Sequence, residues 1–182
     1  VLTGLLLAMN LPSGAPWWVV MVGSFVAIAF AKMVFGGLGN NPFNPALVGR
    51  VFLLTAFGTQ MTTWAKPGQF PLSLADSVTG ATPLGILKEQ GASAVAGISY
   101  YDLLIGNIGG CLGEVSAIAL LIGGGYLLVT RIISWHIPVM YVLTVAIFTG
   151  IAHAVDPAAY APVMFHVLSG GLLLGAIFMA TD

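Results

Sequence analysis

Most of this sequence consists of apolar runs close in length to a membrane span, and short breaks rich in Gly, Pro or Asn separate them. A helix needs about 20 mostly apolar residues to cross the hydrocarbon of a bilayer. The runs cover residues 1–11, 17–35, 46–61, 103–129, 138–155 and 162–181. The pattern therefore predicts an all-α integral membrane protein, a bundle of about six transmembrane helices with Gly/Asn/Pro-rich breaks.

Two of the runs depart from span length. The first, 1–11, is too short to cross a bilayer alone. We therefore expect residues 1–182 to be a single membrane domain, a fragment of a larger multi-span protein whose first helix is truncated. The fourth, 103–129, is longer than one bilayer requires at about 1.5 Å per residue, and glycines crowd its first half. It is expected to be tilted, or broken near those glycines.

Charge is scarce in this chain. Five Lys or Arg and six Asp or Glu make up 6% of the 182 residues, while 58% are hydrophobic. A soluble globular domain carries about 25% charged residues, so the lipid bilayer is the expected partner of this surface. The net charge of −1 provides no basic patch for nucleic acid. One cysteine and three dispersed histidines form no metal-binding motif, and no catalytic residue is assigned.

The few basic residues are unevenly distributed. Lys32, Arg50 and Arg131 flank connectors that fall on one side when the crossings are counted, whereas the long polar stretch 62–102 falls on the other. By the positive-inside rule the first side is cytoplasmic. Residues 62–102 are then predicted to form an extracytoplasmic loop.

That loop contains Asp-Ser-Val-Thr-Gly-Ala-Thr at residues 76–82, followed by Pro83. One interpretation is a plain polar turn, because turns use these residue types. The other is a site of covalent modification. The stretch matches Asp-x-x-Thr-Gly-Ala-Thr, the acceptor pattern on which a flavin transferase installs FMN through a phosphoester to the last Thr. An exposed Thr hydroxyl can attack an activated flavin phosphate, small residues before it leave room for the ligand, and the proline stiffens the backbone after it.

By that resemblance Thr82 is the attachment residue, and the transferase reads Asp76. The remaining implied site residues are Ser77, Thr79, Gly80 and Ala81.

A second polar stretch, Gly-Gly-Leu-Gly-Asn-Asn-Pro-Phe-Asn-Pro at 36–45, interrupts the apolar pattern. Non-helical backbone at membrane depth persists only where protein buries it or where it lines a cavity. Asn amides both donate and accept hydrogen bonds, which suits a ring with carbonyls and ring nitrogens. Asn41 and Asn44 are therefore candidate ligand contacts. An equally supported alternative is an ordinary connector in which Asn44 caps a helix that begins at Pro45.

Four motifs occur in a fixed order along the chain: Gly-Gly-Leu-Gly-Asn-Asn-Pro-Phe-Asn-Pro-Ala, Asp-Ser-Val-Thr-Gly-Ala-Thr, Gly-Asn-Ile-Gly-Gly-Cys-Leu-Gly-Glu-Val-Ser and Met-Ala-Thr-Asp. Together they resemble the RnfD component of the Rnf electron-transport complex and, more distantly, the NqrB component of the sodium-translocating NADH:quinone reductase. The resemblance covers essentially the whole chain.

The resemblance implies a membrane component of an oxidoreductase complex that translocates sodium ions or protons. Electrons would pass through FMN bound covalently at Thr82 and through a second, non-covalent flavin, riboflavin, contacted by Asn41 and Asn44. The implied partners are the other subunits of an Rnf-type complex and the flavin transferase. The implied location is the bacterial inner membrane, with the Thr82 loop on the periplasmic side. Such an electron-transfer component of a translocase would not turn over alone, because no NADH site or iron–sulfur motif is visible.

A multi-span solute transporter or channel with discontinuous helices is the rival class. Asn44-Pro45-Ala46 is the tripeptide that aquaporins carry twice, and it occurs once here. Nothing in such a carrier requires the Thr82 motif. Glu114, inside an apolar run, is either part of an ion path or hydrogen-bonded to a helix end. Cys111 is expected to be a small buried packing residue.

Overall fold

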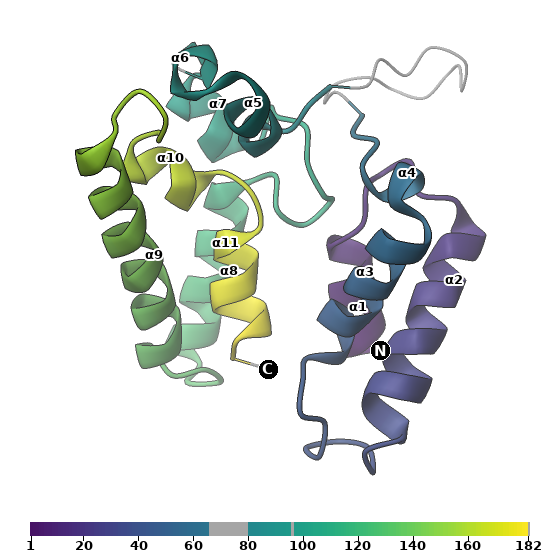
Figure 1. The fold of residues 1–182 in the computed structure, drawn as a ribbon. Coiled ribbons are helices and arrows are strands. Elements are labelled where there is room, and N and C mark those ends of the chain that lie inside the picture. The colour runs from purple at the N-terminus through teal and green to yellow at the C-terminus, as the bar shows by residue number, and fades with distance from the viewer. Residues whose placement is uncertain (66–79, 96, 182) are drawn as a thin grey trace.

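The computed structural model describes residues 1–65, 80–95 and 97–181, and in these ranges every named element is a helix (Figure 1). In chain order these elements are α1 (Leu2–Met9), α2 (Trp17–Phe25), η1 (Val26–Met33), α3 (Pro45–Ala56), α4 (Gly58–Met61), α5 (Pro83–Gln90), α6 (Ala92–Val95), α7 (Tyr100–Ile105), α8 (Ala117–Val129), α9 (His136–Val155), α10 (Val163–Leu168), α11 (Leu172–Leu174) and η2 (Gly175–Met179). The two η elements are π-helical continuations of α2 and α11. The predicted all-α class is confirmed for the described residues.

The helices form two groups that stand side by side (Figure 1). The first consists of α1, α2 with η1, and α3 with α4. Its core includes Leu7, Val19 and Leu53, all fully buried. Small residues bring its helices close together, because a Cβ added at Gly49 would lie 2.9 Å from the carbonyl oxygen of Gly23. This close approach explains why the third apolar run can carry glycine inside a helix.

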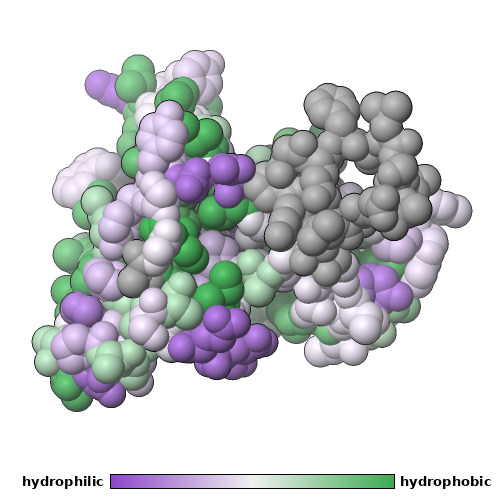
Figure 2. All heavy atoms as spheres, turned by 90° about the horizontal axis from the view of Figure 1, so that it is seen from above, coloured by the Kyte–Doolittle hydropathy of each residue, from purple (hydrophilic) through white to green (hydrophobic). Residues whose placement is uncertain are grey.

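The second group consists of α8, α9, α10 and α11 with η2. Leu120, Phe165 and Leu174 belong to its core. The short helices α5, α6 and α7 lie across one end of this group (Figure 1), and Val95 and Leu103 from them enter the same core. Seen from that end, hydrophilic residues are scattered among apolar ones (Figure 2). The polar stretch 62–102 therefore contributes helices to the fold as well as loop.

The helices differ in whether they are long and apolar enough to cross a bilayer. Among the described residues, α9 alone has the length and hydropathy to cross a bilayer, with a mean hydropathy of 1.8 and only 6% of that segment buried. Three further apolar helices are shorter: Trp17–Met33, Pro45–Ala56 and Ala117–Val129. The predicted number of six spans stays a prediction.

Two of the predicted spans are broken. The fourth run divides into α7, a loop at 106–116 and α8, as its glycines indicated. The sixth run also divides, between α10 and α11, although its sequence had indicated one continuous span. The Ser169 hydroxyl donates to the Phe165 carbonyl at 2.6 Å, and Gly170 has a φ of +71°. A hydroxyl that bonds back to the preceding turn and a left-handed glycine are both features that interrupt a helix.

Segments that were predicted to share a side lie at the same end of the bundle, and the membrane side of each end stays a prediction. Connector 36–45 and the turn between α8 and α9, which holds Arg131, lie at one end of the bundle. Helices α5 to α7 lie at the other end (Figure 1). Arg50 departs from the expectation. Its side chain does not lie at the connector end but reaches inward to Asn10, the residue that ends α1. The polar partner in the interior explains this placement.

Candidate functional site

Thr82 is the residue on which α5 is capped. Its extended backbone precedes Pro83 at the first helical position, and its Oγ1 accepts a hydrogen bond from the backbone N–H of Gly85 at 3.1 Å. Thr at the N-cap followed by Pro is a common helix start, since both satisfy the backbone geometry of the first turn. A Cβ at position 85 would come within 3.1 Å of that hydroxyl oxygen. Glycine there keeps the space around Thr82 open.

The surroundings of Thr82 fit an acceptor residue. Ala81 is exposed and Thr82 is partly exposed, whereas Pro83 is buried and anchors the turn. The N–H of Gly80 donates to the carbonyl of Trp64 at 2.9 Å, which ties the motif to the chain leaving α4. Asp76, Ser77 and Thr79 lie outside the described residues.

A cavity of about 220 Å³ adjoins Thr82. The two broken spans contribute to its wall: Gly109 and Gly110 from loop 106–116, and Gly170 and Gly171 from the break between α10 and α11. Loop 106–116 runs beside the motif, because a Cβ at Gly109 would lie 3.8 Å from the carbonyl oxygen of Ala81. The full described lining is Arg50, Trp64, Thr82, Pro83, Leu84, Ile108, Gly109, Gly110, Glu114, Val115, Gly170 and Gly171.

Arg50 and Glu114 bring charge into this cavity wall. Arg50 donates from Nη1 to Oδ1 of Asn10 at 2.8 Å and from Nη2 to the sulfur of Cys111 at 3.5 Å. Glu114, 9% exposed, accepts at Oε1 from the N–H of Cys111 at 3.1 Å. Buried charged groups require such partners, because isolated charges are costly to desolvate. Glu114 is therefore hydrogen-bonded, but within a loop before α8 and not at a helix end, and a part in an ion path stays a prediction.

Loop 106–116 is attached to the end of α1 by backbone bonds. The N–H of Leu112 donates to the carbonyl of Leu11 at 3.1 Å, and the N–H of Gly113 donates to that of Met9 at 2.8 Å. The thiol of Cys111, which is fully buried, donates to the Asn10 carbonyl at 3.1 Å. The expected packing role of Cys111 is confirmed, with two polar contacts in addition.

The Asn residues of connector 36–45 have contacts within the protein. Asn44 accepts at Oδ1 from the N–H of Ala46 at 3.0 Å and from that of Leu47 at 3.4 Å, so it caps α3 with Pro45 at the first position. Its Nδ2 donates to the Met179 carbonyl at 3.2 Å, near the end of η2. Asn41 donates to the carbonyl of Phe43 at 2.9 Å. The capping interpretation is confirmed, and ligand contact by these residues stays a prediction.

The structure separates the two predicted flavin sites. Helix α5, which Thr82 caps, and connector 36–45 lie at opposite ends of the bundle (Figure 1). Both stretches were predicted from the sequence, but Arg50 was missed as a neighbour of Thr82 and Asn10 as the partner of Arg50. A signal was present, because a cation and an amide inside apolar runs need partners at membrane depth.

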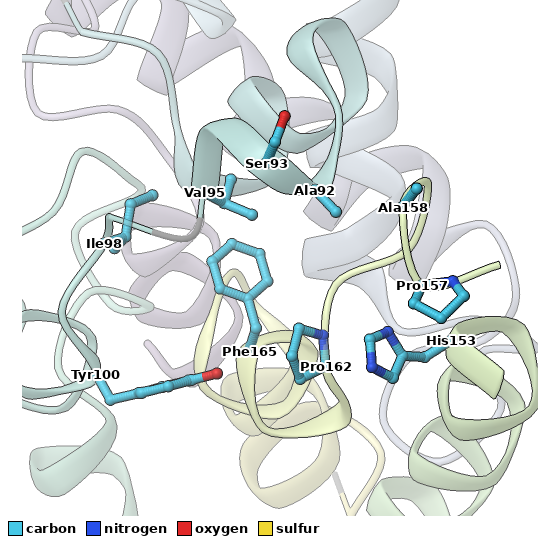
Figure 3. A pocket seen from close by; sticks show the side chains of 10 residues that line it. All are labelled: Ala92, Ser93, Val95, Ile98, Tyr100, His153, Pro157, Ala158, Pro162 and Phe165. Atoms are coloured by element: carbon cyan, nitrogen blue, oxygen red, sulfur yellow. The ribbon is translucent and has the colours of Figure 1, made fainter.

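A second cavity, of about 540 Å³, lies where α6 and α7 meet the ends of α9 and α10 (Figure 3). Phe165, Pro162 and Tyr100 are on its wall, and the His153 ring points toward Pro162 (Figure 3). Nδ1 of His153 is 2.6 Å from the Tyr160 carbonyl, which can only accept, so this nitrogen carries the hydrogen. Within the described ranges, no group of three His, Cys, Asp or Glu side chains is placed to hold a metal ion.

Comparison with known proteins assigns the chain to a protein family. The model of the NQR2, RnfD, RnfE family matches residues 1–182. The chain belongs to this family. It is 50% identical over 184 residues to the D subunit of the Na⁺-translocating ferredoxin:NAD⁺ oxidoreductase complex of Acetobacterium woodii, covering all of this chain and 54% of that protein.

Two further relatives of the NQR2, RnfD, RnfE family are similar over the whole chain. The D subunit of the proton-translocating ferredoxin:NAD⁺ oxidoreductase complex of Clostridium ljungdahlii is 46% identical over 187 residues, with 56% of it covered. The D subunit of the ion-translocating oxidoreductase complex of Stutzerimonas stutzeri is 44% identical over 208 residues, with 58% covered. The chain thus spans little more than half the length of these relatives. The resemblance carried by the four motifs is confirmed at the level of the family.

Proposed function

We propose that this chain is the flavin-carrying part of an RnfD-type membrane protein in an ion-translocating oxidoreductase complex. The observation that carries the proposal is Thr82, the last residue of a complete acceptor motif, partly exposed at a helix start and beside a cavity. The relatives of this chain are named as subunits of such complexes. The other subunits of the complex would be its partners.

Attachment of FMN needs little from this chain beyond a reachable hydroxyl. The Thr82 oxygen would attack the phosphorus of an activated flavin phosphate held by the transferase. An O–P bond would form as the bond to the phosphate leaving group breaks; the leaving group would take the bonding electron pair, and a base of the transferase would take the hydroxyl proton. The existing hydrogen bond from the Gly85 N–H to this oxygen holds the acceptor in place. A phosphate on Thr82 would lie at the start of α5, where backbone N–H groups favour an anion. Once bound, the flavin supplies the electron-transfer chemistry.

Covalent FMN is tested by in-gel flavin fluorescence. The full-length protein is co-expressed with a flavin transferase, denatured, and resolved on a gel. A fluorescent band is expected for the wild type and for Thr63→Val, which alters an exposed threonine just after α4. Thr82→Val is expected to abolish the band. A wild-type band without flavin fluorescence, or a fluorescent Thr82→Val band, would refute the attachment.

The second flavin is proposed at connector 36–45, contacted by Asn41 and Asn44. Support comes from their amides, which both donate and accept, and from the exposure of most of this connector. Asn44→Leu in the purified complex should lower the yield of non-covalent flavin. Asn44→Asp keeps the acceptor that caps α3, so it controls for loss of the helix start. Equal yields from wild type and Asn44→Leu would contradict this site.

The membrane orientation follows the same proposal. In a bacterial inner membrane, connector 36–45 and Arg131 would face the cytoplasm, and Thr82 the periplasm, where a flavin transferase could reach it. Topology reporters fused near Thr82 and near Arg131 should report opposite sides. Reversing the charges of Lys32 and Arg131 should weaken the preference of the protein for this membrane orientation. Reporters on the same side would contradict the arrangement.

The rival function is a solute transporter or channel. The observation that favours it is the pair of broken spans whose ends meet at one polar cavity, an arrangement that carriers use for substrate sites. The fluorescence experiment separates the two, because a carrier has no need of a flavin that survives denaturation.

A further inference from the structure

Arg50 is held in a fixed position at the cavity beside Thr82. It projects from α3 in the first helix group, and its two hydrogen bonds reach the end of α1 and loop 106–116. Both partners, Asn10 and Cys111, are themselves buried. A guanidinium clamped from two sides loses little further freedom when it binds an additional group.

The cavity that Arg50 lines is the one that Thr82 lines. Among its described lining residues, Arg50 is the only basic side chain and Glu114 the only acidic one. A phosphodiester on Thr82 would add a negative charge to a wall that already holds a carboxylate. The Arg50 guanidinium is positioned to offset that charge.

The donor count also suits this assignment. A guanidinium has five N–H donors in a planar fork, which matches the oxygens of a phosphate. Within the part of the chain that the structure describes, the bonds to Asn10 and Cys111 occupy two of them. The other donors can serve an anion in the cavity.

Cavity size limits what can enter. Its volume of about 220 Å³ is below the roughly 300–1,000 Å³ of pockets that enclose a whole ligand. The phosphate and the start of the attached chain are the part that fits, and the flavin ring lies outside. Glycine walls at Gly109, Gly110 and Gly171 allow a backbone approach to such a group.

We propose that Arg50 is the positioning residue for the phosphodiester of a flavin attached at Thr82, and that the cavity between them is an anion subsite. This inference rests on the proposed function, because it needs a flavin phosphate on Thr82. It adds a residue from a distant helix, outside the acceptor motif. Arg50 acts through the phosphate and leaves the flavin ring untouched.

The principal test compares Arg50→Gln and Arg50→Lys with wild type in the full-length protein after co-expression with a transferase. Arg50→Gln should lower covalent flavin per protein on a denaturing gel at least threefold. In the fraction that is loaded, the reduced-to-oxidised ratio at a fixed potential should fall about tenfold, a midpoint shift of about −30 mV for a two-electron couple. The loss of a nearby positive charge disfavours the added electrons. Arg50→Lys, which keeps the charge, should recover most of the midpoint.

A second readout is independent of redox function. Flavinylation of the wild type should raise its thermal midpoint, because the phosphate binds the folded state through Arg50. Arg50→Gln should show a clearly smaller rise between its own unloaded and loaded forms. Comparing each variant with itself removes any general loss of stability. An undiminished rise, together with unchanged flavin content and midpoint, would overturn the proposal.

Two control variants separate position from charge and from packing. Lys32→Gln removes a cation that contacts Thr3 at the other end of the bundle, and it should leave flavin content and midpoint unchanged. Asn10→Ala removes a partner of Arg50 but keeps the guanidinium. Because Asn10 holds the guanidinium in place, Asn10→Ala should shift the midpoint partway toward that of Arg50→Gln. If Lys32→Gln shifts the midpoint as strongly as Arg50→Gln, the effect is not specific to the cavity and the proposal fails. If the wild type carries no covalent flavin at all, the proposed function fails instead.

Discussion

Two glycine-rich breaks of similar composition have opposite environments in this protein. Connector 36–45 is mostly exposed, and the hydrogen bond that Asn41 donates remains within its own turn. Loop 106–116 is bonded to the end of α1 through Leu112 and Gly113, and it carries the buried Glu114.

The contrast teaches that polar composition at membrane depth marks a break without stating its use. Connector 36–45 joins two helices that are neighbours in one group, so its backbone needs few tertiary partners. Loop 106–116 crosses between the two helix groups and must satisfy its buried polar groups with bonds to other segments. Its position, more than its residue types, brings it beside Thr82.

The largest expected effect is steric. In Gly113→Ala, the new Cβ would lie 2.5 Å from the Met9 Cβ and 3.0 Å from the Met9 carbonyl oxygen. Because that carbonyl accepts the Gly113 N–H, relief requires moving the backbone, and we expect a loss of about 3 kcal/mol in the free energy of unfolding. Thermal unfolding in detergent measures it.

The matched variant in connector 36–45 is Gly39→Ala. Gly39 has a φ of +84° and no atom within 4 Å of an added Cβ. Its cost should be limited to that of a left-handed alanine, about 1–2 kcal/mol. A larger loss for Gly39→Ala than for Gly113→Ala would reverse the comparison.

The next effect concerns the buried carboxylate of loop 106–116. Glu114→Leu leaves the Cys111 N–H without its acceptor, and an unsatisfied buried donor costs about 1–3 kcal/mol. Glu114→Gln keeps an acceptor oxygen, so it should retain most of the stability. Chemical unfolding of both variants measures the difference. If Glu114→Gln were as destabilising as Glu114→Leu, the charge itself would hold the loop.

How far the sequence predicts this molecule depends on the range of the interactions. Local signals were sufficient for the start of α3, where Asn44 and Pro45 stand at adjacent cap positions. The start of α5 at Thr82 has a similar local signal, but the stretch was interpreted only as a turn or a modification site. For run 103–129 the glycines left a tilted or a broken span open, and the structure has the break. These features depend on residues within one turn of each other.

Contacts between distant segments were not predictable in the same way. From the sequence, Arg50 was placed among the basic residues beside the connectors. Its hydrogen-bond partner Asn10 lies 40 positions earlier in the chain. The break at Gly170 involves Leu84, whose Cδ1 would lie 2.7 Å from an added Cβ. No periodicity in the sequence indicates that loop 106–116 and the break between α10 and α11 lie next to each other. The cavity beside Thr82 could therefore be identified only from the fold.

A smaller effect is expected at the helix start in connector 36–45. Asn44→Leu removes the cap of α3 and the bond to the Met179 carbonyl, and loss of a cap costs about 1 kcal/mol. Asn44→Asp keeps the capping oxygen but no longer donates to Met179, so it should lose less. The thermal midpoints of the two variants give the ranking. Equal losses would mean that the tie to η2, not the cap, stabilises this connector.

The smallest effect is expected at Asn41. Its amide donates to the carbonyl of Phe43, two residues away, and a single exposed bond of this kind contributes about 0.5 kcal/mol. Asn41→Ala should therefore leave the thermal midpoint nearly unchanged. Because Asn41→Ala should not change stability, it tests ligand binding alone. A drop in non-covalent flavin from the purified complex, without a loss of stability, would assign connector 36–45 a binding role. Unchanged flavin would remove Asn41 from the proposed contacts of the second flavin.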